Sequence, residues 1–218
     1  MSKLAIAIQK QFLEEQKKKY GDQPVWSLID SDTSLKDQLC YDKTEINNMY
    51  NNIVMNPHKY THMNEWADKT MMILNMMKEK GMCPENILLH IAVKQGFPNV
   101  VEKVLEFSSI NVNSKGFNGR TPLHECLISL NPNMKILCIL INAKANFSAR
   151  DNDGNTPLND VMLFWNRKGQ EWLPLLIIDY LPNYDYTMVN NRGENLLEYA
   201  KKMNCEDCVI KKIISKMS

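Results

Sequence analysis

The sequence has little net charge and no long apolar run, and each shortage excludes a class of function. Its 26 Lys and Arg side chains nearly balance 25 Asp and Glu, which leaves a formal net charge of +1. Such a balance argues against broad binding of nucleic acid or anionic membranes. No apolar run reaches the roughly 18 residues of a membrane-spanning helix, and the one after Met1 is too short for a secretory signal. We therefore expect a cytosol-like compartment and no membrane insertion.

Cysteine, histidine and glycine are too sparse to form an evident catalytic or metal motif. Six cysteines in 218 residues do not make the dense framework of a small secreted scaffold, so reduced thiols are expected. Cys205 and Cys208 have a metal-type spacing, but no second pair accompanies them. The chain has neither a phosphate-cradling glycine loop nor a paired-histidine zinc motif. We expect no cofactor and no metal.

A motif recurs along the C-terminal part of the chain. The segment 119–124 (GRTPLH) returns as 154–159 (GNTPLN), and the two Thr-Pro-Leu units are 35 residues apart. A weaker copy, 87–92 (ILLHIA), begins 34 residues before the first Thr-Pro-Leu unit. A fourth, in 193–200 (GENLLEYA), follows the second unit by 39 residues. The sequence therefore predicts an irregular but continuous array whose third unit carries an insertion.

Each part of the motif has a physical role. A glycine before the helix adopts the positive φ of a tight hairpin. Thr121 and Thr156 are expected to cap the helices, and the prolines that follow preset φ at the first helical position. Segments 99–105 and 134–140 have apolar residues at three- and four-residue spacing, which predicts a return helix in each unit.

The order and spacing of these elements resemble the ankyrin repeat over about residues 84–218. The resemblance implies an all-α solenoid of helix-turn-helix units with short hairpin loops, divided into about 84–114, 115–149, 150–188 and 189–218. It also implies that His90 and His124 brace neighbouring units rather than perform chemistry. Asn159 departs from the family by replacing the usual histidine. The last unit departs further, as a terminal unit that meets solvent often does.

The first 83 residues precede the array and are predicted to be helical. Helices are expected over 9–19, 32–39, 44–54 and 64–81, with Thr44 as a cap of the third and Gly81 ending the fourth. Two interpretations stay open, a helical N-terminal cap of the solenoid and an independent functional domain. The methionines crowded between 71 and 82 are expected to fill the core, with an exposed partner groove as the alternative.

The resemblance implies binding of a partner protein through a concave surface built by hairpin tips and first helices. The family pattern places nine residues on or near this surface: Lys94, Gln95, Phe117, Arg120, Ile128, Ser129, Arg150, Asn152 and Asn155. The insertion 163–172 mixes aromatic side chains with Arg and adds Phe164, Trp165 and Arg167 as candidates. Trp165 and Arg167 are expected to be exposed, whereas Phe164 and Trp172 could equally pack the lengthened helix pair.

The function predicted first is a non-enzymatic, monomeric adaptor or inhibitor. The alternative is an enzyme or toxin active in the N-terminal segment, with Cys40 or Cys83 as nucleophile and His58 or His62 as base. A narrower hypothesis makes Asn113, at a position often hydroxylated in the family, the substrate of an asparaginyl hydroxylase. The drifted repeats and abundant Asn, Lys and Ile resemble host-directed ankyrin proteins of intracellular bacteria or large DNA viruses, although a eukaryotic scaffold fragment would look similar.

Overall fold

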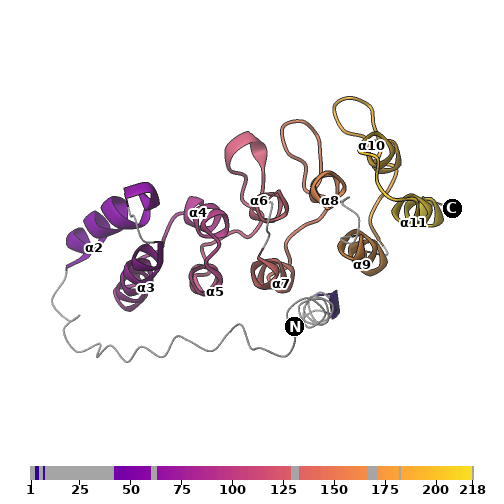
Figure 1. Ribbon diagram of the computed structural model, residues 1–218. Coiled ribbons are helices and arrows are strands. Elements are labelled where there is room, and N and C mark those ends of the chain that lie inside the picture. The colour runs from indigo at the N-terminus through magenta and orange to yellow at the C-terminus, as the bar shows by residue number, and fades with distance from the viewer. Residues whose placement is uncertain are drawn as a thin grey trace.

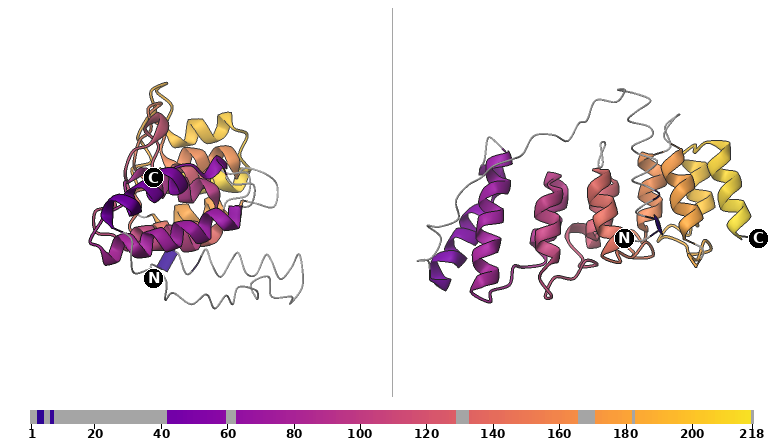
Figure 2. Two further views of the ribbon diagram at one scale, coloured as in Figure 1. Left: turned by 90° about the vertical axis from the view of Figure 1, so that its left-hand side faces the viewer. Right: turned by 90° about the horizontal axis from the view of Figure 1, so that it is seen from below.

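The chain forms an elongated stack of paired helices. The computed structural model describes residues 3–4, 7, 42–59, 63–128, 133–165, 171–181 and 183–217, and no strand occurs among them. Figure 1 shows two rows of helices, and Figure 2 shows that helices of successive units lie side by side along the stack. The predicted all-α solenoid is confirmed.

Each unit contributes one helix to each row. The inner row holds α4 (Ile87–Gln95), α6 (Pro122–Leu127), α8 (Pro157–Phe164) and α10 (Leu196–Lys202). The outer row holds α5 (Pro98–Leu105), α7 (Met134–Asn142), α9 (Trp172–Tyr180) and α11 (Asp207–Met217). Helices of the inner row pack on their neighbours from α4 through α6 and α8 to α10. The return helices predicted over 99–105 and 134–140 are therefore confirmed as α5 and α7.

The inner helices begin as the motif predicts. Thr121 and Thr156 have extended backbone and form capping boxes with the third residue of α6 and α8. Proline follows each threonine at the first helical position, where its missing N–H leaves no carbonyl unpaired. In the last unit Asn195 caps α10 and pairs reciprocally with Glu198. A capping box thus starts all three helices, whichever residues form it.

The core lies between the two rows. Leu89, Leu123 and Leu158 are fully buried on successive inner helices, and Leu137 and Ile177 are buried on the outer helices. Cys126 and Cys138 are buried among them as small apolar side chains. Burial raises the pKa of the Cys126 thiol to about 12, so it packs as a neutral group.

The N-terminal helices continue the stack beyond the first repeat unit. They are α2 (Lys43–Met49), a π-helical turn η2 (Tyr50–Val54) and α3 (Met63–Glu79), which packs on η2 and α5. The fully buried Trp66 donates its indole N–H to the Val54 carbonyl at 3.2 Å and lies 5.8 Å, centroid to centroid, from Phe97. This ring joins the N-terminal helices to the first unit.

The sequence predicted the helices 44–54 and 64–81 nearly at their observed bounds. The cap of α2 was wrong, because Asp42 rather than Thr44 accepts the Glu45 backbone N–H, at 2.8 Å. Gly81 ends α3 with φ of 62°, as predicted. Met76 and Met77 are buried, and Met71, Met72 and Met82 pack against the core, which confirms core filling. The predicted helices 9–19 and 32–39 lie outside the described residues.

Candidate partner-binding surface

A tight hairpin precedes each of the last three inner helices. We call residues 115–120, 150–155 and 189–194 together the hairpin row. In each hairpin a backbone N–H donates to the carbonyl four residues later: Gly116 to Arg120 at 2.7 Å, Asp151 to Asn155 at 2.9 Å and Asn190 to Glu194 at 2.9 Å. The glycines at 119, 154 and 193 have φ of 69°, 75° and 74°, the left-handed region that the turn requires. Figure 1 shows these hairpins beyond the inner row.

Neighbouring hairpins are joined by hydrogen bonds. The Asn152 N–H donates to the Asn118 carbonyl at 2.8 Å, and the Asn191 N–H donates to the Asp153 carbonyl at 2.9 Å. Side chains add further links, since Lys115 Nζ donates to the Arg150 carbonyl at 2.9 Å. The hairpin row is therefore one connected ledge, and a partner that docks on it would order little backbone.

Glycine is needed in the row for space as well as for φ. A Cβ on Gly119 would lie 2.3 Å from Asn152 Oδ1, and one on Gly154 would lie 2.5 Å from Asn191 Oδ1. A Cβ on Gly193 would meet no atom within 4 Å in the described part of the chain. The first two glycines allow the next hairpin to approach closely, whereas Gly193 serves only its own turn.

Several predicted contact residues face solvent on this side. Phe117 is 81% exposed at a hairpin tip, which is unusual for a large apolar side chain. Asn152 is exposed at the tip of the next hairpin, and Lys94 is exposed near the end of α4 with Gln95 half-exposed beside it. Phe117, Asn152, Lys94 and Gln95 therefore form the accessible part of the candidate surface. Ser129 and Arg167 lie outside the described residues.

Three other candidates hold the array together. The exposed Arg150 donates from Nη2 to the Val189 carbonyl at 2.6 Å and so bridges two hairpins. The Asn155 carbonyl lies 3.3 Å from His124 Nε2, and its Oδ1 accepts from Asn190 Nδ2 at 3.1 Å. Arg120 is only partly exposed and faces two buried carboxylates. Replacing any of these would disturb the stack as well as a partner contact.

A cleft opens between the first two units at the ends of α4 and α6 that are remote from the hairpins. Its volume is about 240 Å³, and Lys94, Glu125, Ile128 and Asn133 are among its lining residues. Asn133 also crosses it, because its Nδ2 donates to the Gly96 carbonyl at 3.2 Å. The cleft brings together the predicted residues Lys94 and Ile128, which are far apart in sequence.

The structure corrects the expectation for the insertion. Trp165 was expected to be exposed but is only 8% exposed, and its ring meets Trp172 edge-on at 6.0 Å. Phe164 and Trp172 are half-buried against the core. The aromatic residues at both ends of the insertion therefore pack the α8–α9 pair. The insertion combines aromatic and charged residues. A packing cluster has the same composition as an interface hot spot, so the sequence did not distinguish the two.

His124 joins neighbouring units as the resemblance implied, whereas His90 bonds to the end of its own unit. His124 Nδ1 accepts the Thr121 backbone N–H at 3.1 Å, so the ring proton is on Nε2, which donates to the Asn155 carbonyl at 3.3 Å. Burial lowers the pKa of His124 to about 4, which keeps the ring neutral. His90 Nε2 similarly lies 3.1 Å from the Ser114 carbonyl. Both rings brace the stack, and neither has a catalytic arrangement.

Asn159 takes over only half of this histidine role. Its Oδ1 accepts the Thr156 backbone N–H at 2.8 Å, which reproduces the local cap. Among the described residues, the shorter amide has no counterpart of the bond that His124 makes to the next unit. The Tyr184 hydroxyl reaches the Thr156 hydroxyl at 2.8 Å from the segment after α9. This bond joins two segments of the third unit rather than the third unit to the fourth.

A buried charged cluster lies beneath the hairpin row. Arg120 Nε is 3.8 Å from Asp151 Oδ2, and its Nη2 is 4.0 Å from Asp160 Oδ1. These are ion-pair distances, and Arg120 Nε and Asp160 Oδ2 have no hydrogen-bond partner among the described residues. Burial raises the pKa of Asp160 to about 7, although Arg120 opposes the shift. Desolvation of this carboxyl therefore outweighs the attraction of the guanidinium.

Sequence reasoning missed the contribution of the last hairpin. Val189 is 45% exposed, and Asn191 and Arg192 are exposed at its tip. Aligning Gly193 with Gly119 and Gly154 would have made Val189 equivalent to Arg150 and Arg192 equivalent to Asp153. Gly193 was therefore the sequence signal that could have identified this hairpin.

The residues weighed for catalysis or metal binding are scattered. Cys83 and His58 are exposed on separate segments, and Cys40 and His62 lie outside the described residues. Cys208 is exposed, whereas the Cys205 thiol lies 3.4 Å from the Met162 carbonyl. In the described part of the chain, no three His, Cys, Asp or Glu side chains gather as a metal site would require. No described helix is both long and apolar enough to cross a bilayer.

Comparison with known proteins identifies the repeats. A family described as ankyrin repeats, three copies, matches residues 89–167. This part of the chain is an array of ankyrin repeats. Ankyrin repeats generally mediate protein–protein interaction and are typically non-enzymatic.

Relatives of this ankyrin array come from different organisms. The tyrosine-protein kinase HTK16 of Hydra vulgaris is 39% identical over 56% of this chain and 16% of its own length. Human rabankyrin-5 is 32% identical over 51% of this chain and 9% of its own. A putative ankyrin repeat protein, FPV031, of fowlpox virus is 27% identical over 59% of this chain and 37% of its own. The chain therefore spans well under half the length of each of these relatives.

Proposed function

We propose that this ankyrin protein is a non-enzymatic interaction module that binds a partner protein through the hairpin row and the adjoining inner helices. The observation that carries the proposal is Phe117, which is 81% exposed on a hairpin that hydrogen bonds fix to its neighbour. An aromatic side chain held on a rigid ledge gives contact area at low entropic cost. Lys94 and the cleft beside Ile128 extend the surface along the inner helices.

The insertion 163–172 has a narrower role in this proposal than its composition predicted. Trp165 is buried, whereas Leu163, the apolar residue at the start of the insertion, is 39% exposed. We infer that a partner meets Leu163 rather than Trp165 at this end of the surface. An adaptor or an inhibitor would use the same contacts, and both act by occupying the partner.

Substitutions on opposite faces test the proposal. Phe117→Ala and Lys94→Glu alter the hairpin and inner-helix side, whereas Lys135→Glu alters an equally exposed lysine of α7 in the outer row. The tagged variants would be used to capture proteins from a eukaryotic cell lysate, with capture quantified by mass spectrometry. We expect the first two to reduce recovery of a shared partner about tenfold, as a hot-spot loss does, and the α7 control to retain it. Loss with the α7 control alone would overturn the surface assignment.

The N-terminal helices fit a cap in this proposal. The Tyr50 hydroxyl accepts the Glu85 backbone N–H at 3.0 Å, and Trp66 covers Phe97, so these helices shield the first unit. A solenoid needs such a shield at its exposed end. We propose the division into 1–83 and 84–218 on this basis. The alternative, an enzyme or toxin activity in 1–83, has no described observation in its favour.

The setting of the protein is also part of the proposal. Buried, neutral Cys126 fits a reducing, cytosol-like compartment, and the protein is proposed to act there as a monomer. The fowlpox virus relative supports action inside a host cell, whereas the human and Hydra relatives fit a cellular scaffold equally well.

Asn113 keeps its proposed role as a hydroxylation substrate. Its Oδ1 accepts the Asn146 backbone N–H at 2.8 Å, so this asparagine joins two successive units. Incubation with an asparaginyl hydroxylase followed by peptide mass spectrometry tests the proposal. We expect the mass of one oxygen atom on the peptide that contains Asn113, and an unchanged mass would contradict it.

A further inference from the structure

The outer row of helices has a break at its centre. Helices α3 and α5, α5 and α7, and α9 and α11 pack directly on each other, but α7 and α9 have little direct contact. The break lies at the junction between the second and third units. Inner helices α6 and α8 still pack together, so only the outer side of this junction is open.

The break is a groove on the outer side of the array. Its volume is about 750 Å³ with Lys3 and Leu4 among its lining residues, and its other walls come from the end of α7, the segment 144–148, the end of α9 and the segment that follows it. Ile141, Phe147, Tyr180, Leu181 and Tyr184 make most of its lining apolar. An unfilled apolar groove of this size would leave much hydrocarbon surface in water.

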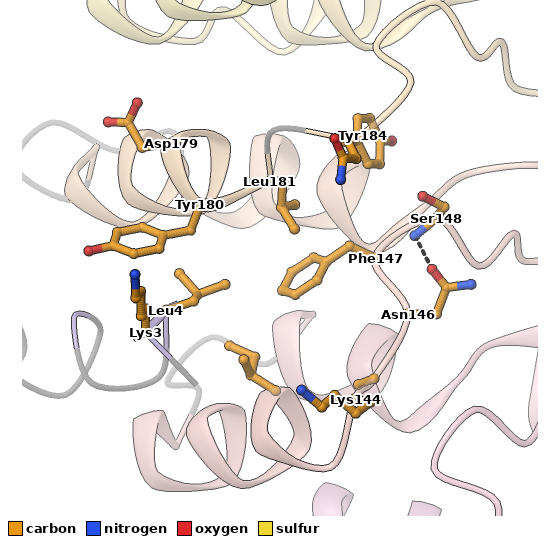
Figure 3. A pocket seen from close by; sticks show the side chains of 13 residues that line it. Lys3, Leu4, Lys144, Asn146, Phe147, Ser148, Asp179, Tyr180, Leu181 and Tyr184 are labelled. Atoms are coloured by element: carbon orange, nitrogen blue, oxygen red, sulfur yellow. Dashed lines mark hydrogen bonds between the residues drawn. The ribbon is translucent and has the colours of Figure 1, made fainter. Parts of the chain in front are cut away.

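The chain places one of its own apolar side chains in this groove. Leu4 is only 6% exposed, and Lys3 beside it is exposed. Figure 3 shows Leu4 pointing into the groove, with Tyr180 and Leu181 on one side and Phe147 on the other. In Figure 1 the short indigo ribbon near the N-terminus, which is the described part of this segment, lies beside α7 and α9 and far from α2.

Chain length allows this contact. The sequence places 37 residues between Leu4 and Asp42, the first described residue before α2. A fully extended chain of that length spans on the order of 120 Å, more than the few helix diameters between α2 and α9. The local sequence also fits, because Leu4 and Ala7 are three residues apart, as residues on one face of a helix are, and their backbone is helical.

We propose that the groove between α7 and α9 is a docking site whose occupant is the N-terminal segment of the same chain, anchored by Leu4. The docked segment closes the open side of the junction between the second and third units. It links the two units without altering the inner helices and hairpin row, so this proposal does not depend on the proposed partner surface.

Hydrogen exchange of the full chain tests the docking. We expect Leu4→Asp to raise amide exchange about tenfold in 144–148 and in the end of α9, because the buried leucine no longer protects them. Leu163→Asp is the matched control, since Leu163 is an exposed leucine at 39%, and should leave these segments unchanged. Unchanged exchange in Leu4→Asp would overturn the proposal.

A peptide supplied in trans identifies the occupant. A labelled peptide of residues 1–12 should bind full-length Leu4→Asp and bind the wild type at least tenfold more weakly, because the tethered Leu4 already occupies its place in the groove. A peptide with Leu4→Asp should not bind, nor should the native peptide bind a chain that also carries Tyr180→Asp on the groove rim. A wild type that sediments as a dimer, with Leu4→Asp monomeric, would assign the groove to a second copy and overturn the proposal.

Discussion

The hairpins at Gly154 and Gly193 share a backbone conformation but differ in their surroundings. Their φ values are 75° and 74°, yet only Gly154 has the next hairpin packed against it. The same contrast holds for the helices that follow. Leu158 is fully buried between two units, whereas Leu197 at the equivalent place in the last unit is half-exposed. The stabilisation at a repeat position thus has two parts. One comes from contacts within the unit, and the other exists only where another repeat unit follows.

The largest difference is expected from the two equivalent leucines. Leu158→Ala removes a side chain enclosed on all sides and should cost roughly 2–5 kcal/mol of unfolding free energy. Leu197→Ala removes a partly hydrated side chain and should cost about 1–2 kcal/mol. Urea denaturation followed by far-UV circular dichroism measures both. Equal losses would mean that a following unit adds nothing to the core.

The two glycines separate backbone strain from crowding. Gly193→Ala should cost about 1–2 kcal/mol because alanine disfavours positive φ. Gly154→Ala has the same backbone strain, and its Cβ is also forced against Asn191 and the Arg150 guanidinium. This crowding should add roughly 1–3 kcal/mol to the loss of unfolding free energy. The same denaturation experiment compares the two variants. A smaller loss for Gly154→Ala would contradict close packing of the hairpin row.

His124→Asn tests the bond between units by itself. The amide can still accept the Thr121 N–H, as Asn159 does from Thr156, but it cannot reach the Asn155 carbonyl. We expect a loss of about 1 kcal/mol, the net value of one hydrogen bond. Glu198→Gln is the control in the last unit, where the Glu198 side chain caps its own helix. It should change the unfolding free energy by only a few tenths of a kcal/mol.

Two buried groups should give the interior junction opposite pH dependences. Asp160 has its pKa raised from 3.8 to about 7, so its stabilising contribution is present below pH 4 and is lost as pH rises to 7. His124 has its pKa lowered from 6.5 to about 4, so its contribution is present above pH 6.5 and is lost as pH falls to 4. In the wild type these two effects partly offset each other.

Asp160→Asn exposes the histidine effect. The variant should lose unfolding free energy between pH 6.5 and pH 4 more steeply than the wild type, because the opposing carboxyl is gone. Denaturation midpoints across this range measure the difference. Parallel curves would show that Asp160 titrates normally and that burial does not keep its carboxyl protonated.

Sequence reasoning predicted the repeat architecture because its signals are local. The Thr-Pro pairs fix where α6 and α8 start, and hairpin glycines fix where turns lie, without reference to distant residues. The predicted cap of α2 was wrong because Asp42 and Thr44, two residues apart, are both suitable cap residues. Local spacing decided the helices but not their exact ends.

The candidate surface was less predictable because it depends on contacts between units. Arg150 and Asn155 looked like contact residues in isolation, yet their neighbours in the next hairpin engage them. Trp165 looked like an exposed hot spot, but Trp172, across the insertion, covers it. The groove that Leu4 enters exists because α7 and α9 have little direct contact, which the sequence spacing does not reveal. Tertiary neighbours, rather than residue type, separate a binding residue from a structural one.

The most direct test of the proposed function is photo-crosslinking inside eukaryotic cells. A photoreactive phenylalanine analogue would replace Phe117 in one variant and Lys135 of α7 in another, and crosslinked proteins would be identified by mass spectrometry. We predict that position 117 crosslinks a partner protein and that position 135 does not capture it. A partner crosslinked from 135 and never from 117 would contradict binding through the hairpin row.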